Sequence, residues 1–432
     1  MLVMEWKWLK CVVLIITVKC HGCTQFEGNN LSSHNRINNL FNYIQKVKPK
    51  EMPALTVSEE FNARSINEDI NLNITQLFQK YGYGVEEHQV TTSDGYILDI
   101  FRVPGNGPVV FIMHGLICSS DDFVSTGPEH GLPYLLADLG YDVWLGNARG
   151  NKHGRKHVTM SPNSAEFWEF SFDEIGRYDL TAMIDYVLEE TNQRKLVYIG
   201  HSQGTTSFFV MTSEYPEYND KISVMIALSA VAYLSHQRNV LLTSLSTIYK
   251  PLYVIGQNIG LYEILADNET TKAFTSTFCG TPTLAYIICN NLLFLVFGPD
   301  YAQINATVLP VIYGHFPGGA ALKQFAHYGQ EIITGKFNQF DRGFVGNINK
   351  YGTPVPPDYY LEKVTSKVVI LYSDNDYLST AQDRSKLTAR LPNVIGNYRI
   401  PFAKFSHSDF IFAKDVRKLV YYKVVEILNN NT

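Results

Sequence analysis

Several features that would assign the chain to a common class of protein are missing from the sequence. Its net charge of −5 leaves no surplus of positive charge, so it carries no electrostatic footprint for nucleic acid. It has no H-E-x-x-H motif, and its 12 histidines are scattered, with His153 and His157 in a basic loop. We therefore expect no nucleic-acid partner, no metal and no cofactor.

Long uninterrupted apolar runs are also scarce. Residues 11–18 form a short apolar run that follows two lysines and precedes small residues, which is the pattern of a signal peptide cleaved near Gly22. A signal anchor is the alternative, although a helix needs roughly 20 apolar residues to span a bilayer. Residues 284–297 are strongly apolar, but two asparagines interrupt them, so they fit a buried helix or a segment that contacts lipid. We expect no stable membrane span.

Cysteine is scarce, with six residues in 432. Three of the six lie in the N-terminal processing region, and we interpret their C-x-x-C spacing as an accident of the cleavage site rather than as a redox pair. Cys279 and Cys289 could close a short loop by a disulfide in an oxidising compartment. Cys118 is then unpaired, and we expect it to be buried.

Five N-glycosylation sequons fit passage through the secretory pathway. They begin at Asn30, Asn73, Asn268, Asn305 and Asn430. Together with the N-terminal pattern, they predict that the protein leaves the cytosol.

Short apolar segments that alternate with helical patterns predict an α/β fold. Expected strands lie at 88–92, 96–103, 108–113, 141–145, 196–199, 224–229, 367–372 and 397–401, and expected helices at 172–189, 205–215 and 415–428. Such alternation is typical of a mostly parallel sheet with helices on both faces. Functional residues should then gather at the carboxyl ends of the strands.

The alternation breaks over residues 231–365, which are apolar, aromatic and punctuated by glycine and proline. We interpret this segment as a cap or lid inserted over the active site, between two parts of one core at 81–230 and 366–432. A signal peptide at 1–22 and an N-terminal segment at 23–80 precede the core.

The stretch Gly200-His-Ser-Gln-Gly204 joins a predicted strand to a predicted helix. This is a G-x-S-x-G pattern in the setting that a nucleophile elbow requires, with Ser202 at the tip of the turn. A residue with a Cβ at either glycine would collide with neighbouring backbone in so sharp a turn. The alternative interpretation is an ordinary glycine-rich turn.

A serine nucleophile needs a base and a group that orients the base, and in this fold class the order along the chain is Ser, acid, His. His407 is the sole histidine after residue 330. The strand at 367–372 ends just before Asp374 and Asp376, either of which can supply the acid, and we favour Asp376. His201 adjoins the serine, but its side chain should point away from the nucleophile, so we expect a structural role for it.

The oxyanion that forms during ester hydrolysis needs two preorganised hydrogen-bond donors. One should be the backbone N–H of Gln203, directly after the nucleophile. The other should be the backbone N–H of Leu116, in the His-Gly-Leu loop that follows an earlier strand.

The chain resembles the acid lipases of the gastric and lysosomal type, from about Glu60 to Val424. The matching motifs are Val90-Thr-Thr-Ser-Asp-Gly-Tyr-Ile-Leu98, His114-Gly-Leu116, Gly146-Asn-Ala-Arg-Gly150, Phe167-Trp-Glu-Phe-Ser-Phe-Asp-Glu174, Gly200-His-Ser-Gln-Gly-Thr205 and Phe316-Pro-Gly-Gly319. The resemblance implies an α/β-hydrolase core with a cap and lid. It also implies hydrolysis of neutral lipid esters (triacylglycerol, sterol esters or both) at a lipid–water interface, often at acidic pH, by a secreted or lysosomal enzyme.

The same resemblance assigns Ser202 as nucleophile, Asp376 as acid and His407 as base, and supports the oxyanion donors and the Cys279–Cys289 bond. We expect no obligate protein partner. The chain departs from the family pattern at Ser373-Asp374 and at Lys152-His153-Gly154, which puts substrate preference rather than activity in question. Two alternatives to a lipase are a carboxylesterase for small esters and a lipid-binding or storage protein on a lipase scaffold.

Overall fold

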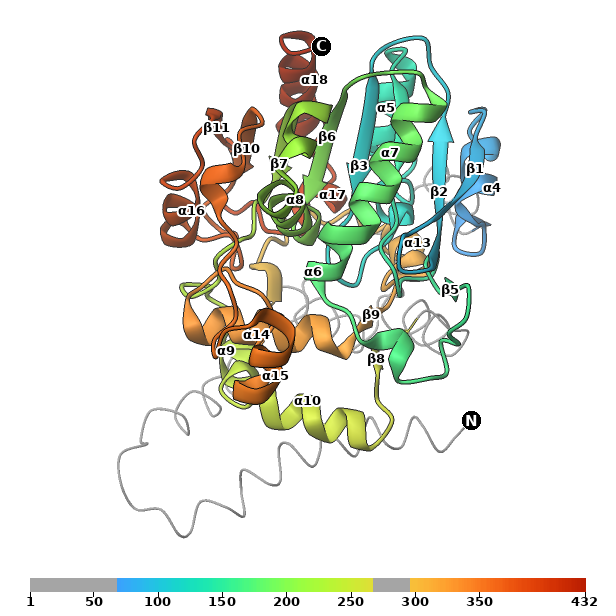
Figure 1. The fold of residues 1–432 in the computed structure, drawn as a ribbon. Coiled ribbons are helices and arrows are strands. Elements are labelled where there is room, and N and C mark those ends of the chain that lie inside the picture. Colours follow the sequence, from blue (N-terminus) through green and yellow to red (C-terminus); the bar gives the residue numbers. More distant parts are fainter. Residues whose placement is uncertain (1–67, 267–295) are drawn as a thin grey trace. The chain divides into compact units, whose positions relative to one another are not determined.

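The structure is a computed structural model that describes residues 68–266 and 296–432 (Figure 1). The predicted signal peptide, the sequons at Asn30 and Asn268, and the Cys279–Cys289 pair lie outside the described residues. Most of the apolar run at 284–297 lies outside them as well.

A nine-stranded mixed sheet forms the centre of the fold, with the order β1-β2-β4-β3-β6-β7-β10-β11 and β5 beside β2. The strands from β4 to β11 in this order run parallel, whereas β1, β2 and β5 join through antiparallel pairs. Their bounds are β1 Glu86–Thr91, β2 Tyr96–Val103, β3 Val109–Met113, β4 Asp142–Leu145, β5 Lys156–His157, β6 Leu196–His201, β7 Ile222–Leu228, β10 Val368–Tyr372 and β11 Val394–Arg399. The predicted mostly parallel sheet is confirmed.

Two hydrophobic cores cover the two faces of this sheet. Alternate residues of β3 point to opposite sides, so Phe111 and Met113 join one core while Val110 and Ile112 join the other. Helices α6 (Phe172–Glu174), α7 (Leu180–Glu190), α8 (Gln203–Glu214) and α16 (Ala381–Thr388) pack on the first core. Helices α4 (Ile74–Lys80), α5 (Leu132–Asp138), α17 (Asp409–Phe412) and α18 (Tyr422–Asn429) pack on the second.

The helix expected at 172–189 is interrupted by a π-helical turn, Ile175–Asp179, between α6 and α7. Gly176 approaches α8 so closely that a Cβ there would lie 2.7 Å from the carbonyl oxygen of Ser207. The carboxylate of Asp179 is held by Arg149. The helix expected at 415–428 likewise contains a π-helical turn, Arg417–Tyr421, before α18. Tertiary contacts therefore override the regular helical pattern at these two places.

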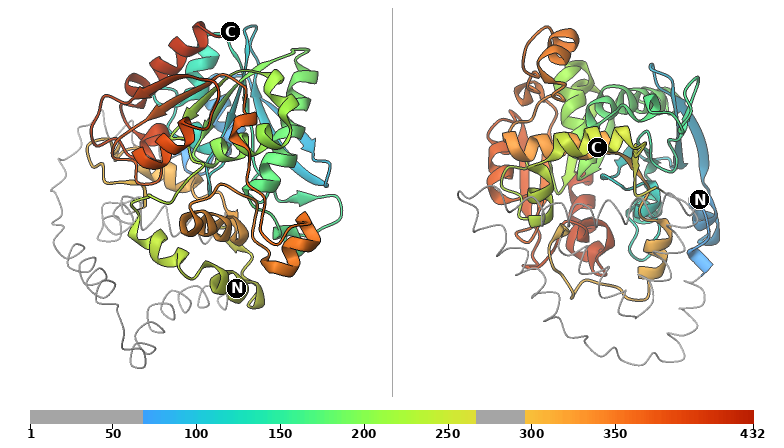
Figure 2. Two further views of the ribbon diagram at one scale, coloured as in Figure 1. Left: turned by 60° about the vertical axis from the view of Figure 1, so that its left-hand side comes forward. Right: turned by 90° about the horizontal axis from the view of Figure 1, so that it is seen from below.

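The described part of residues 231–365 adds no strand to the nine-stranded sheet. It holds the helices α9 (Val240–Ser246), α10 (Tyr249–Asn258), α13 (Leu309–His315), α14 (Leu322–Thr334) and α15 (Gly343–Tyr351), and a two-stranded ladder of β8 (Glu263–Ile264) and β9 (Ala320–Ala321). Figures 1 and 2 show α9, α10, α14 and α15 gathered beyond one end of the sheet. In the described ranges, no helix is long and apolar enough to cross a membrane.

Candidate active site

Ser202 occupies the sharp turn between β6 and α8. Its backbone has φ 51° and ψ −119°, a left-handed conformation that is strained for a residue with a side chain. A Cβ at Gly204 would lie 2.5 Å from the carbonyl oxygen of Met113, and one at Gly200 would lie 3.0 Å from the carbonyl of Gly204. Both glycines are therefore required by the close packing of this turn, as the sequence predicts.

His407 and Asp376 form a buried pair at the carboxyl end of the sheet. Nδ1 of His407 lies 3.0 and 3.1 Å from the two carboxylate oxygens of Asp376, and the two side chains are 2% and 1% exposed. The backbone N–H groups of Leu378 and Ser379 donate to the same carboxylate at 2.9 and 2.8 Å. Burial alone would raise the pKa of Asp376, but His407 and the hydrogen bonds outweigh it and lower this pKa.

Asp374, the other candidate acid, lies elsewhere. Its side chain is 49% exposed and pairs with Arg399 at 2.6 Å. The structure therefore brings Asp376, and not Asp374, to His407.

Ser229 is a further member of this site that the sequence interpretation missed. Its hydroxyl donates to Asp376 and lies 2.7 Å from Nδ1 of His407. It follows β7 directly, between β6 and β10 in the sheet, and the position of a serine at the carboxyl end of a central strand is the signal that could have found it.

The other ring nitrogen of His407, Nε2, is buried and has no hydrogen-bond partner in the described part of the chain. His407 and Ser202 line the same pocket. Phe297 stacks on the imidazole with ring centroids 5.6 Å apart. His201 bonds through Nε2 to the backbone oxygen of His407 at 3.0 Å, and burial lowers the pKa of His201 to about 3, so it is a neutral support for this loop.

The loop after β3 packs directly on Ser202. A Cβ at Gly115 would lie 3.1 Å from Cβ of Ser202 and 3.6 Å from its Oγ. Across the residues described, the backbone N–H groups of Leu116 and Gln203 have no hydrogen-bond partner. Leu116 lines the same pocket as Ser202, and Gln203 follows Ser202 directly in the chain.

His114 fixes this loop to the one after β4. Its Nε2 accepts from the backbone N–H of Ala148 at 3.1 Å, so Nδ1 carries the proton and donates to the carbonyl of Gly115 at 2.8 Å. Burial lowers the pKa of His114 to about 4, which keeps the ring neutral. On the other side, the backbone N–H of Gly318 donates to the carbonyl of Ile117 at 2.7 Å.

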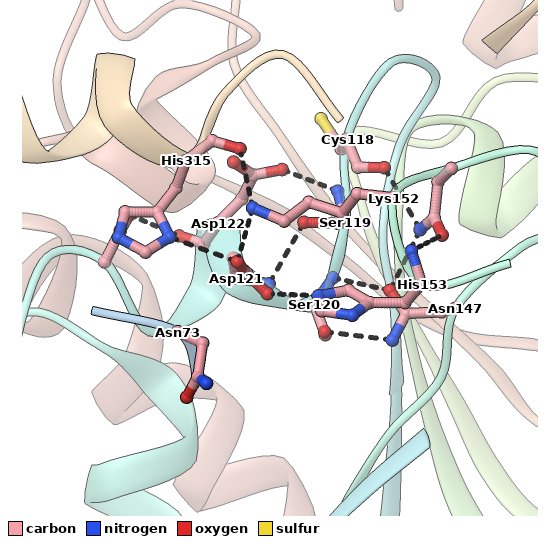
Figure 3. A network of polar contacts seen from close by, with 12 residues as sticks. Asn73, Cys118, Ser119, Ser120, Asp121, Asp122, Asn147, Lys152, His153 and His315 are labelled. Carbon is pink, nitrogen blue, oxygen red and sulfur yellow. Dashed lines mark hydrogen bonds and ion pairs between the residues drawn. The ribbon is translucent and has the colours of Figure 1, made fainter. Parts of the chain in front are cut away.

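A buried ionic network lies beneath the same loop (Figure 3). Asp121 contacts Lys152 at 2.7 Å, His153 at 2.7 Å and His315 at 3.1 Å. Burial would raise the pKa of Asp121, but Lys152 and His153 outweigh it and hold the pKa well below its usual range. Lys152 and His153 thus join the loop after β4 to residues 118–123.

The neighbouring carboxyl group behaves in the opposite way. Asp122 accepts from the backbone N–H of Ser119 at 2.8 Å, and its second oxygen is buried without a partner within the described ranges. Burial, reinforced by the charge of Asp121, raises the pKa of Asp122 to about 7. Cys118 adjoins it, and the prediction that this cysteine is buried is confirmed.

The pocket at Ser202 and His407 has a mainly apolar wall from α13, α17 and their flanking residues. The apolar side chains of this wall include Ile304, Leu309, Ile312, Phe316, Ile411 and Phe412. A pocket of this kind can bury a hydrocarbon chain next to the serine hydroxyl.

A pair of acidic residues lies at the edge of this pocket. The buried carboxyl groups of Asp300 and Asp409 interact with each other, with Lys404 nearby. Burial and the partner carboxyl raise the pKa of Asp409 well above its usual range. Since Asp409 lies two residues after His407, the pair connects residues 297–303 to the segment that holds His407.

Three predicted sequon asparagines fall within the described residues. Asn73 is exposed at the start of α4 and accepts from the Thr75 hydroxyl at 2.6 Å. Asn430 is exposed near the C-terminus, whereas Asn305 is half-buried and lines the pocket. The described ranges also hold no group of three His, Cys, Asp or Glu side chains placed to bind a metal.

Comparison with known proteins identifies related sequences over most of the chain. A family model described as a partial α/β-hydrolase lipase region matches residues 74–127, and one for the α/β-hydrolase fold matches residues 108–276. Lipase 1 of Drosophila melanogaster is 39% identical over 86% of this chain and 83% of its own length. Gastric triacylglycerol lipase of Bos taurus is 37% identical over 84% of this chain and 92% of its own length.

A solved structure supports the same fold. The crystal structure of a candidate lipase from Sulfolobus solfataricus superposes with a TM-score of 0.53 and 13% identity, covering 81% of this chain and 94% of that one. At this identity the likeness concerns the fold alone.

Proposed function

The chain belongs to the α/β-hydrolase lipases, a family of carboxylic ester hydrolases, and we propose that it acts through Ser202 as nucleophile, His407 as base and Asp376 as orienting acid. One observation carries the proposal. In the buried Asp376–His407 pair, Nδ1 of the imidazole contacts the carboxylate and Nε2 has no partner among the described residues, while His407 and Ser202 line the same pocket. Hydrogen bonds between nucleophile and base are often formed only once substrate is bound.

In the proposed mechanism, Nε2 of His407 takes the proton of the Ser202 hydroxyl as Oγ attacks the ester carbonyl. The backbone N–H groups of Leu116 and Gln203 bind the oxyanion. His407 then returns the proton to the departing alcohol, which leaves an acyl-enzyme. A water molecule, deprotonated by His407, releases the fatty acid and restores Ser202.

The proposed substrates are neutral lipid esters at a lipid–water interface. Two features support them: the apolar wall of the pocket, and the bovine relative named for triacylglycerol. Triacylglycerols and sterol esters both fit this chemistry. Residues 231–365 are proposed to act as the cap that controls access.

Acidic working conditions are proposed as well. Burial raises the pKa of both Asp300 and Asp409, so this interacting pair should hold together at low pH and be pushed apart by charge repulsion when both groups ionise. We further propose a secreted or lysosomal protein with a cleaved signal peptide, a Cys279–Cys289 disulfide and glycans. The exposed Asn73 is the best-supported glycan site.

The test is a hydrolysis profile across acyl chain length and alcohol at several pH values. A lipase should prefer long chains and respond to an emulsified interface, with highest turnover below pH 6. The runner-up function, a carboxylesterase for small soluble esters, would instead give a preference for short chains in solution. Labelling of Ser202 by a fluorophosphonate would exclude a lipid-binding protein that lacks activity.

A further inference from the structure

Ser229 makes contacts that no step of the proposed mechanism uses. It lies immediately after β7, and its backbone N–H donates to the carbonyl of Leu371 in β10 at 3.0 Å. Its φ of 56° is left-handed, and its side chain is fully buried. The strained backbone turns the hydroxyl into the gap between Asp376 and His407, where it contacts both side chains.

We propose that Ser229 is a positioning residue for the catalytic acid–base pair. The inference rests on the proposed function of Asp376 and His407. In this arrangement the Ser229 hydroxyl sets the position of the proton on the imidazole and stabilises the charge of the carboxylate. It touches neither substrate nor the reacting atoms.

The proton count defines the first effect. A serine hydroxyl has one hydrogen, and that of Ser229 goes to Oδ2 of Asp376. A lone pair of Oγ therefore faces Nδ1 of His407 at 2.7 Å, which is closer than either carboxylate oxygen. Nδ1 must then carry the ring proton, so Nε2 is left free to act as a base.

The charge of the carboxylate defines the second effect. Asp376 is buried, and its donors are His407, Ser229 and two backbone N–H groups. Removing the hydroxyl deprives a buried anion of one donor, which makes the carboxylate more basic and strengthens its hold on a protonated imidazole. In the described part of the chain, His201 and Arg384 are further titratable groups that interact with this pair.

The experiment compares Ser229→Ala and Ser229→Gly with Ser373→Ala. Both variants at position 229 lose the hydroxyl, but glycine also relieves the left-handed backbone. Ser373 is a matched control because it is equally buried near Asp376, and its hydroxyl has no partner in the described part of the chain. Ester turnover is measured as kcat and KM from pH 4 to 8, with thermal unfolding and fluorophosphonate labelling to establish that each variant is folded.

The expected result is that both variants at position 229 move the acid limb of kcat/KM upward by about one pH unit. Their kcat should fall roughly ten-fold with little change in KM. The far-downfield Nδ1 proton resonance of His407 should move in both, and Ser373→Ala should match the parent protein.

Suppose that the acid limb of kcat/KM does not move in either variant at position 229, while Ser202→Ala is inactive. This result would overturn the inference about Ser229 and leave the proposed function standing. A shift in the glycine variant alone would assign the effect to the backbone, and an equal shift in Ser373→Ala would assign it to packing; either overturns the inference. Activity that survives Ser202→Ala would overturn the proposed function and this inference with it.

Discussion

The carboxylate of Asp376 lies 3.0 Å from Nδ1 of His407, although the two residues are 31 positions apart and follow different strands. Asp374, only two residues before Asp376, forms an exposed pair with Arg399 instead. Two aspartates that are nearly equivalent in sequence therefore have different environments, and only one can orient the histidine.

Asp376→Asn should lower kcat by about 10⁴-fold, because an amide in place of the carboxylate favours the wrong imidazole tautomer. Asp374→Asn is the matched control and should change kcat less than two-fold, because it alters an exposed pair only. Steady-state turnover of an emulsified ester checks both. Equal losses in the two variants would contradict the assignment of the acid.

Arg149→Met should destabilise the fold by about 3–5 kcal/mol, because it leaves two carboxylates without their partner. Arg149 is 1% exposed and bonds to Asp94 at 2.6 Å and to Asp179 at 2.7 Å. Arg399→Ala, which breaks an exposed pair, should cost less than about 1 kcal/mol. Urea unfolding measures both, and similar costs would show that burial does not set the strength of these pairs.

The two adjacent aspartates of the network in Figure 3 should give opposite pH dependences of stability. The pKa of Asp122 is raised to about 7 in the folded protein, so between about pH 4 and 7 the folded state binds more protons than the unfolded state. The contribution of Asp122 to the free energy of unfolding is therefore greatest below pH 4 and is lost as the pH rises to 7. Asp122→Asn should remove this loss. Relative to the parent protein, the free energy of unfolding of this variant should increase by up to roughly 4 kcal/mol between pH 4 and pH 7.

Asp121→Asn is the control with the opposite sign. The pKa of Asp121 is lowered, so its contribution is present above about pH 4 and disappears as the pH falls through the folded pKa. This variant should be destabilised most at pH 7 and least at strongly acidic pH. Denaturant unfolding at several pH values checks both, and parallel curves for the two variants would contradict the charge states described above.

Asp409→Asn should extend activity toward neutral pH. The raised pKa of Asp409 means that the contact with Asp300 is complete at low pH and weakens as the pH rises through the folded pKa. Asparagine stays neutral and can still donate to Asp300, so the upper limb of kcat/KM should move to higher pH. An unchanged upper limb of kcat/KM would show that the Asp300–Asp409 pair does not set the working pH.

The elbow, the histidine and the strands could be predicted from sequence because each depends on local pattern. Gly200 and Gly204 bracket Ser202, and buried strands read as short apolar runs. The choice between Asp376 and Asp374 required burial, which no local pattern supplies. The order serine, acid, histidine along the chain is satisfied by either aspartate.

Ser229 and the Asp121–Asp122 network could not be predicted, because their meaning comes from neighbours distant in the chain. Ser229 meets Asp376 across 147 positions, and Asp121 meets His315 across 194. The π-helical turn at Ile175–Asp179 depends equally on the approach of α8. Non-local packing decides these features, whereas periodicity reports only which face of an element is buried.

Ser202→Ala tests the central claim most directly, with lipid-ester turnover and fluorophosphonate labelling measured on the same preparations. The variant should retain the parent protein's unfolding temperature within a few degrees, lose labelling completely and lose kcat by at least about 10⁴-fold. A folded Ser202→Ala protein that still hydrolyses the ester at more than a tenth of the parent rate would contradict the account.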